Sequence, residues 1–446
     1  MAKKIKDSNN AADILIKKIK ERSAKVAIIG LGYVGLPLSV ELARQGFTVT
    51  GFDISKKKVD LLNSGKSDID DIPNSAVAEI VKNKKFKATT DWSLIKDMDT
   101  VSICVPTPLS KTKDPDVSYI LAALDSIKNH LKNGSLVVLE STTYPGTTEE
   151  LILPILSENK KQVGKDFFLA FSPERVDPGN INFTTKNTPR VVGGITPACT
   201  ETAKVFYEQT ISNIYTVSST QSAEMVKLLE NTFRSVNIGL VNEVALMCDR
   251  LGLDVWEIID AAATKPFGFM PFYPGPGLGG HCIPIDPHYL SWKLKSLNYS
   301  ARFIELAGDV NSHMPEYVVD RIANLLNDRL AKSINKSKIV ALGVAYKRDI
   351  QDMRESPALD VIKLLEDKGA KVQYNDPYVP SFYIDAKTYK SSKFSAKLLQ
   401  DADLVIILTD HTDYDYEFIV KNSKAIFDSR NATKHVKSGR NKIELL

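Results

Sequence analysis

Short apolar runs alternate with amphipathic stretches along most of this chain, and glycine turns separate them. The first clear unit reads KVAIIGLGYVGLPLSVELARQGFTVTGFD, from Lys25 to Asp53. The apolar runs at its two ends are typical of buried strands, and the segment between them has helical spacing. The pattern predicts strand, tight turn, helix and strand, which is the beginning of a doubly wound α/β domain.

The same alternation continues through four further apolar runs, which lie within 100–108, 135–148, 166–179 and 190–194. Ligands bind at the carboxyl ends of parallel strands, so Thr107, Thr142 and Glu174 are predicted to face one crevice. Turn formation and helix capping are the alternative roles of such residues. Glu174 fits those roles least, because an acid directly after an apolar strand faces either solvent or a site.

A second α/β unit begins at Lys338 and repeats the order of the first. Gly46 corresponds to Gly369 and Asp53 to Asp376, while DADLVIILTD at 401–410 echoes DMDTVSICVPT. Only one glycine of the phosphate-binding turn is kept, so we expect a second Rossmann-like domain that binds a nucleotide differently. Lys347, Arg348 and Arg354 are candidates for phosphate contacts. A structural duplicate without a ligand is the alternative.

Helical periodicity dominates between these units. The residues at 221–259 predict a long helix with a break near Gly239 and a stop at Gly252. Its mostly apolar faces indicate burial between domains or against a partner subunit. One polar stripe interrupts them, which is either a solvated face or part of a site: Glu224, Lys227, Asn231 and Arg234. Residues 302–330 predict another helix, interrupted by Pro315. Residues 11–23 predict a short amphipathic helix packed on the protein, with a membrane-surface helix as the alternative.

The stretch from Phe272 to Leu290, FYPGPGLGGHCIPIDPHYL, does not fit the alternation. Its glycines and prolines argue against a regular helix or central strand and favour a shaped loop. Cys282 in that loop is predicted to be a positioned nucleophile. A buried core cysteine is one alternative. A metal site formed by His281, Cys282, Asp286 and His288 is the other, although the spacing fits no standard zinc pattern.

Composition narrows the possible functions. A chain of 446 residues with a net charge of +4 is expected to form two or three domains and gives no sign of a nucleic-acid or membrane partner. The four cysteines are far apart in sequence, which indicates free thiols in a reducing compartment. No signal peptide or apolar run of membrane-spanning length is present, so a soluble cytoplasmic protein is expected.

The turn after the first strand carries the dinucleotide fingerprint GLGYVG at 30–35, followed by an acid, Asp53, at the end of the second strand. Gly32 lets the backbone approach a pyrophosphate at the start of the next helix. A carboxylate at Asp53 would accept from the ribose 2′-OH and repel a 2′-phosphate, which favours NAD over NADP. Lys58 lies nearby and opposes that preference.

A nicotinamide cofactor implies hydride transfer. A cysteine nucleophile becomes useful when an aldehyde must be oxidised further through a thioester. That reaction requires an oxyanion stabiliser and an activator of water, for which Lys227, Asn231 and Glu174 are the candidates.

At these residues the chain resembles the nucleotide-sugar 6-dehydrogenase family, from about Lys25 to Arg430. The motifs that carry the resemblance are GLGYVGLP, VPTP, STTYPG, SPER, SAEMVKLLENTF, GLGGHCIPID and GVAYKRDIQDMRESP. The resemblance implies an NAD-dependent, four-electron oxidation of a sugar C6 alcohol to a uronic acid. It also implies a UDP-sugar substrate and a homodimer formed through the long central helix.

The resemblance further implies roles for individual residues. Cys282 would be the nucleophile, Lys227 and Asn231 the oxyanion stabilisers, Glu174 the group that handles water, Asp286 its support, and Thr142 a holder of water and cofactor. The predicted cofactor contacts are Gly30, Gly32, Tyr33, Val34, Gly35, Asp53, Lys58, Thr107, Thr142 and Arg354. The predicted substrate contacts are Glu174, Arg175, Lys227, Asn231, Tyr273, Gly275, Gly279, Lys347 and Arg430, and no metal is expected.

The motif forms point to one branch of that family. UDP-glucose enzymes typically read N-P-E-F-L-x-E-G, whereas SPERVDPG lacks the second acid and has Asp177 one place early. The segments PFYPGPGLGGHCIPIDP and FSPERVDPGN resemble the UDP-N-acetylglucosamine branch. UDP-N-acetyl-D-glucosamine is therefore the expected substrate, for surface polysaccharide synthesis. UDP-N-acetylmannosamine, UDP-N-acetylgalactosamine and UDP-glucose are the alternatives. A single-step dehydrogenase and a non-catalytic nucleotide-binding protein are the alternative functions.

Four regions are expected: an N-terminal extension at 1–24, an NAD-binding Rossmann domain at 25–215, a central helical dimerisation region with the cysteine loop at 216–330, and a UDP-sugar-binding Rossmann-like domain at 331–446.

Overall fold

The computed structural model describes residues 11–69, 72–110, 114–158, 160–176, 182–385 and 387–446. They form two compact units. The first comprises the residues up to Glu230 together with 292–297, and the second comprises 231–291 and 298–446. Part of the expected N-terminal extension, 1–10, and Asp177 lie outside the described residues.

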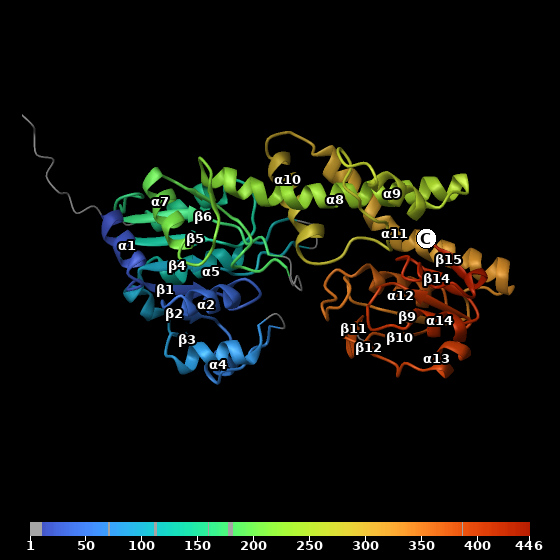
Figure 1. Cartoon of the computed structure of the whole chain (residues 1–446). Coiled ribbons are helices and arrows are strands. Elements are labelled where there is room, and N and C mark those ends of the chain that lie inside the picture. The colour runs from blue at the N-terminus through green and yellow to red at the C-terminus, as the bar shows by residue number, and fades with distance from the viewer. Residues whose placement is uncertain (1–10, 70–71, 111–113, 159, 177–181, 386) are drawn as a thin grey trace, which may run out of the picture. The chain divides into compact units, whose positions relative to one another are not determined.

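The first unit is built around one sheet and the helices beside it (Figure 1). Its strands are β1 Lys25–Ile29, β2 Thr48–Phe52, β3 Phe86–Thr89, β4 Thr100–Ile103, β5 Ser135–Leu139, β6 Phe167–Phe171, β7 Arg190–Gly194 and β8 Ile214–Thr216. Its helices are α1 Ala11–Lys20, α2 Gly35–Arg44, α3 Lys56–Asn63, α4 Asn74–Lys82, α5 Ser118–Ile127, α6 Leu153–Leu156 and α7 Pro197–Tyr207, with the turns η1 Trp92–Asp97 and η2 Thr148–Ile152.

The strand order of this sheet is β3-β2-β1-β4-β5-β6-β7-β8. Successive side chains of a strand point to opposite faces, so Val26 and Ile28 of β1 pack in one core with α2 and α7. Ala27 and Ile29 pack in a second core with α5. Burial on both faces explains why the strands read as continuous apolar runs. The predicted doubly wound α/β fold is confirmed.

The expectation that the run at 190–194 is a further parallel strand is wrong. β7 pairs antiparallel with β6, in the register Ala170↔Gly194, and parallel with β8. A parallel pair needs a crossover connection, which is usually a helix. The described residues between β6 and β7 contain no helix, so the chain returns in the opposite direction.

The second unit contains a smaller sheet in the order β10-β9-β13-β14-β15. Its strands are β9 Lys338–Leu342, β10 Lys371–Asn375, β13 Leu404–Ile407, β14 Ile426–Asp428 and β15 Ile443–Leu445, and the hairpin beside it is β11 Ser381–Ile384 with β12 Lys387–Lys390. Its helical elements are α9 Val255–Ala263, α11 Arg302–Leu330, α12 Pro357–Asp367, α13 Ala396–Asp401, α14 Tyr416–Asn422 and the turn η3 Arg440–Lys442. Helices α8 Thr220–Leu251 and α10 Cys282–Lys295 have residues in both units.

The predicted repeat of the first unit in the second is confirmed in its details. The order of the three neighbouring strands β2-β1-β4 in the first sheet corresponds to β10-β9-β13 in the second. The turn glycines Gly46 and Gly369 both have positive φ, 96° and 87°. Asp99 before β4 accepts a hydrogen bond from the backbone N–H of Lys25, and Asp403 before β13 accepts the equivalent bond from Lys338.

The predicted break of the central helix near Gly239 is wrong, since α8 is continuous from Thr220 to Leu251. Gly239 is needed for packing instead, because a Cβ there would lie 3.2 Å from both Cα and Cβ of Ala307 in α11. The predicted stop is confirmed: Gly252 has a φ of 69°. Asp254 then starts α9, because its carboxylate accepts hydrogen bonds from the backbone N–H of Trp256 and Glu257.

Two predictions based on proline are also wrong. Pro315 lies inside a continuous α11. It is buried, as are Met314 and Val318, and this tertiary packing maintains the helix. Pro284 does not prevent α10 from starting at Cys282, because a proline in the first helical turn removes no intrahelical hydrogen bond. Pro287 is tolerated further inside the same helix. Only the part of 272–290 before Cys282 is a loop.

Replacing Gly239 with leucine tests the close packing of α8 on α11. The added side chain would overlap Ala307, so we expect a loss of about 1–3 kcal/mol in unfolding free energy. The better helix propensity of leucine offsets at most about 1 kcal/mol of that loss. Urea or thermal unfolding of the purified protein measures it.

Gly308→Ala is the control, because the nearest atom to a Cβ there, in His288, lies at an ordinary 3.6 Å. We expect it to leave stability unchanged or slightly higher. A Gly239→Leu variant as stable as the parent would contradict the packing role of Gly239.

Candidate active site

The turn between β1 and α2 has the geometry of a phosphate-binding turn. Gly30 has a φ of 86°, and a Cβ on Gly35 would lie 1.9 Å from the carbonyl oxygen of Gly30, so neither position accepts a side chain. Nothing lies within 4 Å of the Cβ position of Gly32, which leaves the backbone there open to a ligand. Val34, before α2, makes no side-chain hydrogen bond to the first helical N–H groups. An open backbone and an uncapped helix N-terminus fit the pyrophosphate of NAD.

Asp53 follows β2 and is half-buried. Its carboxylate accepts hydrogen bonds from the backbone N–H of Leu31, at 3.1 Å, and of Ser55, at 2.9 Å. Lys58 donates to the carbonyl oxygen of Leu31 and forms an ion pair with Asp68 at 3.0 Å. The charge of Lys58 is thus already balanced, which weakens its expected opposition to NAD.

The corresponding acid of the second unit is placed differently. Asp376 is buried, and its carboxylate accepts hydrogen bonds from the backbone N–H of Val344, Ala345, Tyr378 and Val379 and pairs with His411 at 3.1 Å. Burial alone would raise the pKa of Asp376, but these hydrogen bonds lower it. Both of its carboxylate oxygens are occupied by partners within the protein, so Asp376 is less available to a ribose than the half-buried Asp53.

Predicted residues at the ends of β4 and β5 lie together. The Thr107 hydroxyl donates to the carbonyl oxygen of Thr142 at 2.7 Å. The loop that continues from Thr142 is fixed by Glu224 of α8, whose buried carboxylate accepts from the backbone N–H of Gly146, at 2.6 Å, and of Thr148, at 2.9 Å. Glu224 is therefore a structural anchor in the predicted polar stripe.

Glu174, after β6, is mostly buried, with 15% of its side chain exposed. One carboxylate oxygen accepts from the backbone N–H of Arg175 and Val176, at 2.7 and 3.0 Å. The other faces the guanidinium of Arg190 at 3.3 Å. Arg175, a predicted substrate contact, is held by Glu230 of α8 in a two-pronged ion pair.

The polar stripe of α8 is mostly a buried face. Glu224, Lys227 and Asn231 are at most 8% exposed, while Arg234 is exposed. The solvated-face alternative is therefore wrong for the first three. Lys227 and Asn231 lie one helical turn apart, so both present their polar groups on one side of α8.

Three predicted residues of the second unit are brought together. Cys282 is the first residue of α10, and Asp286 lies one turn later on the same helix face. The side-chain amide of Asn231 donates to the carboxylate of Asp286 at 2.5 Å. Cys282 is exposed, unlike the other three cysteines, so the core alternative is wrong for it. The helix dipole stabilises a thiolate at this position.

The glycines before Cys282 are explained by packing. A Cβ on Gly275 would lie 2.6 Å from the guanidinium of Arg430, and one on Gly279 would lie 2.6 Å from Tyr346. Gly280 meets the ring of Tyr346 and donates its N–H to the carbonyl oxygen of Arg354. The loop thus lies against the turn after β9 and against Arg430, which follows β14. These contacts account for Gly279 and Gly275 without a sugar, and their role in substrate binding stays a prediction.

The loop also positions its flanking side chains. Tyr273 stacks on Trp256 of α9, with ring centroids 5.9 Å apart, and donates its hydroxyl to Asp260. His281 is half-buried, and its pKa is lowered, first by burial and then by the positive charge of Arg354. His281 is thus a neutral side chain in the loop. Among the described residues, no three side chains of the metal-binding types come together.

The cationic residues of the second Rossmann-like domain differ in their partners. Arg348 forms an ion pair with Asp410, and Arg354 forms one with Asp352 at 2.6 Å. Lys347 is half-buried. Arg430 donates to the carbonyl oxygen of Leu408 at 3.1 Å, and burial lowers the pKa of its guanidinium. Within the part of the chain that the structure describes, no carboxylate forms an ion pair with Arg430, so its charge is available to an anionic ligand.

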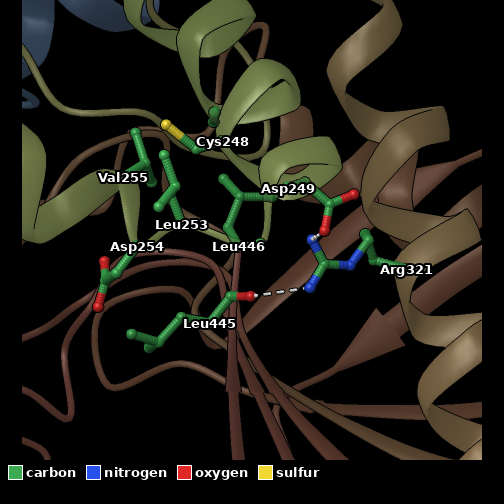
Figure 2. A pocket seen from close by; sticks show the side chains of 10 residues that line it. Cys248, Asp249, Leu253, Asp254, Val255, Arg321, Leu445 and Leu446 are labelled. Carbon is green, nitrogen blue, oxygen red and sulfur yellow. Dashed lines mark hydrogen bonds and ion pairs between the residues drawn. The ribbon is translucent and has the colours of Figure 1, made fainter.

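Figure 2 shows a cavity of about 240 Å³ in the second unit that has none of the predicted site residues in its lining. Arg321 crosses it, donating to Asp249 of α8 and to the carbonyl oxygen of Leu445. Cys282, Asp286 and Asn231 are not among the residues that line this cavity.

Comparison with known proteins agrees with this geometry. Three domains of the UDP-glucose/GDP-mannose dehydrogenase family match the chain: the NAD binding domain at 24–211, the central domain at 221–313 and the UDP binding domain at 340–435. The chain belongs to this family. It is an NAD-dependent oxidoreductase of nucleotide-sugars.

Similar members of the family act on N-acetylated sugars by name. UDP-N-acetyl-D-mannosamine dehydrogenase of Methanocaldococcus jannaschii is 37% identical, over 91% of this chain and 92% of its own. UDP-N-acetyl-D-glucosamine 6-dehydrogenase of Pseudomonas aeruginosa is 35% identical, over 80% and 84%. The solved structure of UDP-D-ManNAc dehydrogenase from Pyrococcus horikoshii has a TM-score of 0.84 at 34% identity, covering 93% of this chain and 97% of that one.

Sequence reasoning missed two charged residues of this dehydrogenase. Glu140 follows β5 directly and Arg190 opens β7, and both are buried. The available signal was their position, because charged residues at the ends of otherwise apolar strands must find partners inside the protein. Among the described residues no helix is both long and apolar enough to cross a membrane.

Replacing Asp53 with alanine tests the ribose contact. The variant loses a charged acceptor, so we expect the dissociation constant of NAD to rise about tenfold. We also expect discrimination against NADP to fall, because repulsion of the 2′-phosphate is removed. Titration of cofactor fluorescence with both reduced cofactors measures this.

Asp60→Ala is the matched control, since that exposed acid on α3 pairs only with Lys56 in the described structure. We expect Asp60→Ala to bind both cofactors like the parent. Unchanged NADP discrimination in Asp53→Ala would mean that Asp53 does not hold the ribose.

Proposed function

We propose that this family member oxidises the C6 alcohol of a UDP-N-acetylhexosamine to the carboxylate in two successive oxidations at Cys282. The observation that supports it is the cluster of Cys282, Asp286 and Asn231, which offers an exposed sulphur at a helix N-terminus beside a hydrogen-bonded acid and amide. One alcohol, one water and two NAD⁺ give one carboxylate, two NADH and three protons.

The residues divide the work as follows. NAD, when bound, accepts a hydride in each of the two oxidations. After the first, the Cys282 thiolate adds to the aldehyde carbon, and Lys227 and Asn231 stabilise the oxyanion of the thiohemiacetal. Oxidation of that adduct leaves a thioester on Cys282.

Hydrolysis then releases the product. A water oxygen bonds to the thioester carbon, and one of its protons passes to Glu174. The carbon–sulphur bond breaks, its electron pair returns to Cys282, and the acid loses its remaining proton to solvent. Asp286 keeps Asn231 oriented, and Thr142 holds water and cofactor.

Binding is proposed to follow the sequence motifs. NAD contacts Gly30, Gly32, Tyr33, Val34, Gly35, Asp53, Lys58, Thr107, Thr142 and Arg354. The UDP-sugar contacts Glu174, Arg175, Lys227, Asn231, Tyr273, Gly275, Gly279, Lys347 and Arg430, of which Arg430 has a half-buried charge suited to a phosphate. The proposed regions remain those predicted from the sequence: the extension at 1–24, the NAD-binding domain at 25–215, the central region at 216–330 and the UDP-sugar-binding domain at 331–446.

The sugar is proposed to carry an N-acetyl group at C2. The motif forms favour the glucosamine epimer, whereas relatives named for the mannosamine epimer match a larger share of the chain. Both therefore belong in the test, with UDP-N-acetylgalactosamine and UDP-glucose for comparison.

A spectrophotometric assay with purified protein, NAD and these four UDP-sugars tests the function. We expect about two NADH per sugar for a four-electron oxidation. We also expect an N-acetylhexosamine substrate to exceed UDP-glucose in kcat/KM by at least about tenfold. Cys282→Ser should lose more than about 1,000-fold in turnover, the scale of nucleophile loss in other enzymes.

Cys248→Ser is the control, since that cysteine lies in a core and contacts no reacting group. One NADH per sugar would indicate a single-step dehydrogenase, and wild-type turnover of Cys282→Ser would remove the thiol from the reaction. NAD binding without turnover of any sugar would indicate a nucleotide-binding protein.

The homodimer is also a proposal, and the outer face of α8 supports it. Large apolar side chains on that face are exposed: Met225, Leu229, Phe233, Leu240, Met247 and Leu251. Successive members of this set are four or seven residues apart, that is, about one or two helical turns, which places them in one stripe. A stripe of exposed apolar side chains of this length is typical of a surface that a partner covers.

Placing glutamates at Leu240 and Met247 together should break the dimer, because two charges would have to be buried. We expect the particle mass in analytical ultracentrifugation to fall to that of one chain, with unchanged circular dichroism. Glu316→Lys, an exposed change on α11, should leave the mass unaffected. A double variant with the parent's mass would contradict this interface.

A further inference from the structure

A buried charged cluster lies in the first unit beside Glu174. Glu140 follows β5, Arg190 is the first residue of β7, and Tyr207 is the last residue of α7. All three are buried, since the exposed fraction is 0% for Tyr207, 1% for Glu140 and 3% for Arg190. None of the three belongs to the predicted set of catalytic or binding residues.

The guanidinium of Arg190 is held from several sides. It forms an ion pair with Glu140, donates from Nε to the Ser172 hydroxyl at 3.0 Å, and lies over the Tyr207 ring at 4.5 Å from the ring centre. Tyr207 in turn donates its hydroxyl to Glu140 at 2.8 Å. The cluster is therefore rigid, with every charged group paired.

Arg190 contacts two acids in this cluster. Nη2 of Arg190 faces Glu140, and Nη1 lies 3.3 Å from Glu174. Burial raises the pKa of Glu140, and the charge of Arg190 opposes that rise. A buried ion pair contributes little stability compared with apolar residues of the same size, so stability alone does not account for the cluster.

We propose that Arg190 is a positioning residue for Glu174, and that Glu140 competes for Arg190 and thereby sets how readily Glu174 accepts a proton from water. The proposal rests on the proposed role of Glu174 in thioester hydrolysis. In that step the water proton moves to Glu174 as the new carbon–oxygen bond forms and the carbon–sulphur bond breaks.

The geometry gives this competition a direction. The hydrogen bond from Arg190 orients one carboxylate oxygen of Glu174, while the backbone N–H groups of Arg175 and Val176 hold the other. A full positive charge on Arg190 favours the ionised carboxylate and weakens it as a base. Glu140 shares that cation, so less of its positive charge acts on Glu174.

Other charged or titratable groups around Glu174 do not replace this pair. Cys104, after β4, and Tyr207 both have a raised pKa, first because of burial, and are therefore neutral. Arg175 is next to Glu174 in the chain, but its charge is matched by Glu230 of α8. Among the described residues of the first unit, Arg190 is thus the cation paired with Glu174, and Glu140 is the second acid that shares this cation.

Opposite shifts in pH dependence test the proposal. In Glu140→Gln, Arg190 has only Glu174 as an anionic partner, so the acid limb of the kcat profile should move about 1 pH unit lower. In Arg190→Gln, Glu174 loses its cation, so the limb should move about 1 pH unit higher. Arg190→Gln should also lower kcat with little change in KM for the sugar.

The hydrolytic step can be observed directly. On rapid mixing with NAD and the UDP-sugar, Arg190→Gln should give a burst of NADH followed by slow turnover. Intact-protein mass spectrometry of the quenched sample should show the sugar acyl group on the protein, and Cys282→Ser should abolish that adduct. If Arg190 only stabilised the fold, Arg190→Gln would lower the fraction of active enzyme. No adduct would then accumulate, and the acid limb of the kcat profile would not move.

Controls keep the outcome interpretable. Glu201→Gln makes the same chemical change at an exposed site on α7 and should leave the profile unaltered. Thermal melts show whether each variant is folded at the assay temperature. If a single variant does not fold, Glu140→Gln/Arg190→Met removes both charges together, and its acid limb should lie above that of the parent.

Shifts of both single variants in the same direction, unshifted limbs, or a double variant with the parent's profile would overturn the proposal. The proposed function is tested independently by the parent enzyme. If the parent forms one NADH per sugar, the function is wrong. If it forms two and the variants do not shift, only the role of Arg190 and Glu140 is wrong.

Discussion

The polar groups on the buried face of α8 must find hydrogen-bond partners, and this requirement organises the surrounding segments. Glu224 takes two backbone N–H groups of the loop after β5, and Asn231 binds Asp286 of α10. Asn242 accepts the N–H of Gly275 and donates to Asn311 of α11. An unpaired buried polar group costs about 1–3 kcal/mol, so each loop has one favourable position. The helix thereby fixes the loops that carry Thr142 and Cys282.

The two α/β units show how one fold can serve different ligands. Both contain the same order of three neighbouring strands, the same turn glycine and the same acid before the third of these strands in the chain, β4 or β13. Their second acids differ, because Asp53 remains half-open whereas Asp376 is enclosed by four N–H groups and His411. The closing of that site agrees with a domain whose family counterpart binds UDP, and in which Arg430 forms no ion pair with a carboxylate of the described residues.

The sequence predicted the fold where local pattern and tertiary structure agree. Apolar runs with glycine turns located the strands, and the stop at Gly252 was correct because it depends on one backbone conformation. The predictions at Gly239 and Pro315 were wrong for the same reason. They followed the low helix propensity of glycine and proline, whereas tertiary packing maintains the helix at both positions. The reversed β7 depends on the path of the chain and has no local signal. The family motifs supplied the site residues, because their sequence context is specific although they lie far apart in the chain. Glu140 and Arg190 were missed because their pairing is formed only by folding.

The hydrogen bonds from α8 to neighbouring backbone have a consequence for local unfolding. The amides of Gly146, Thr148 and Gly275 are bound to side chains of the helix and not to their own loops. These loops cannot open separately without stranding a buried carboxylate or amide, so their exchange with solvent hydrogen should follow the opening of α8. Loops that resemble surface connections in the sequence are then protected from hydrogen exchange as strongly as a core helix.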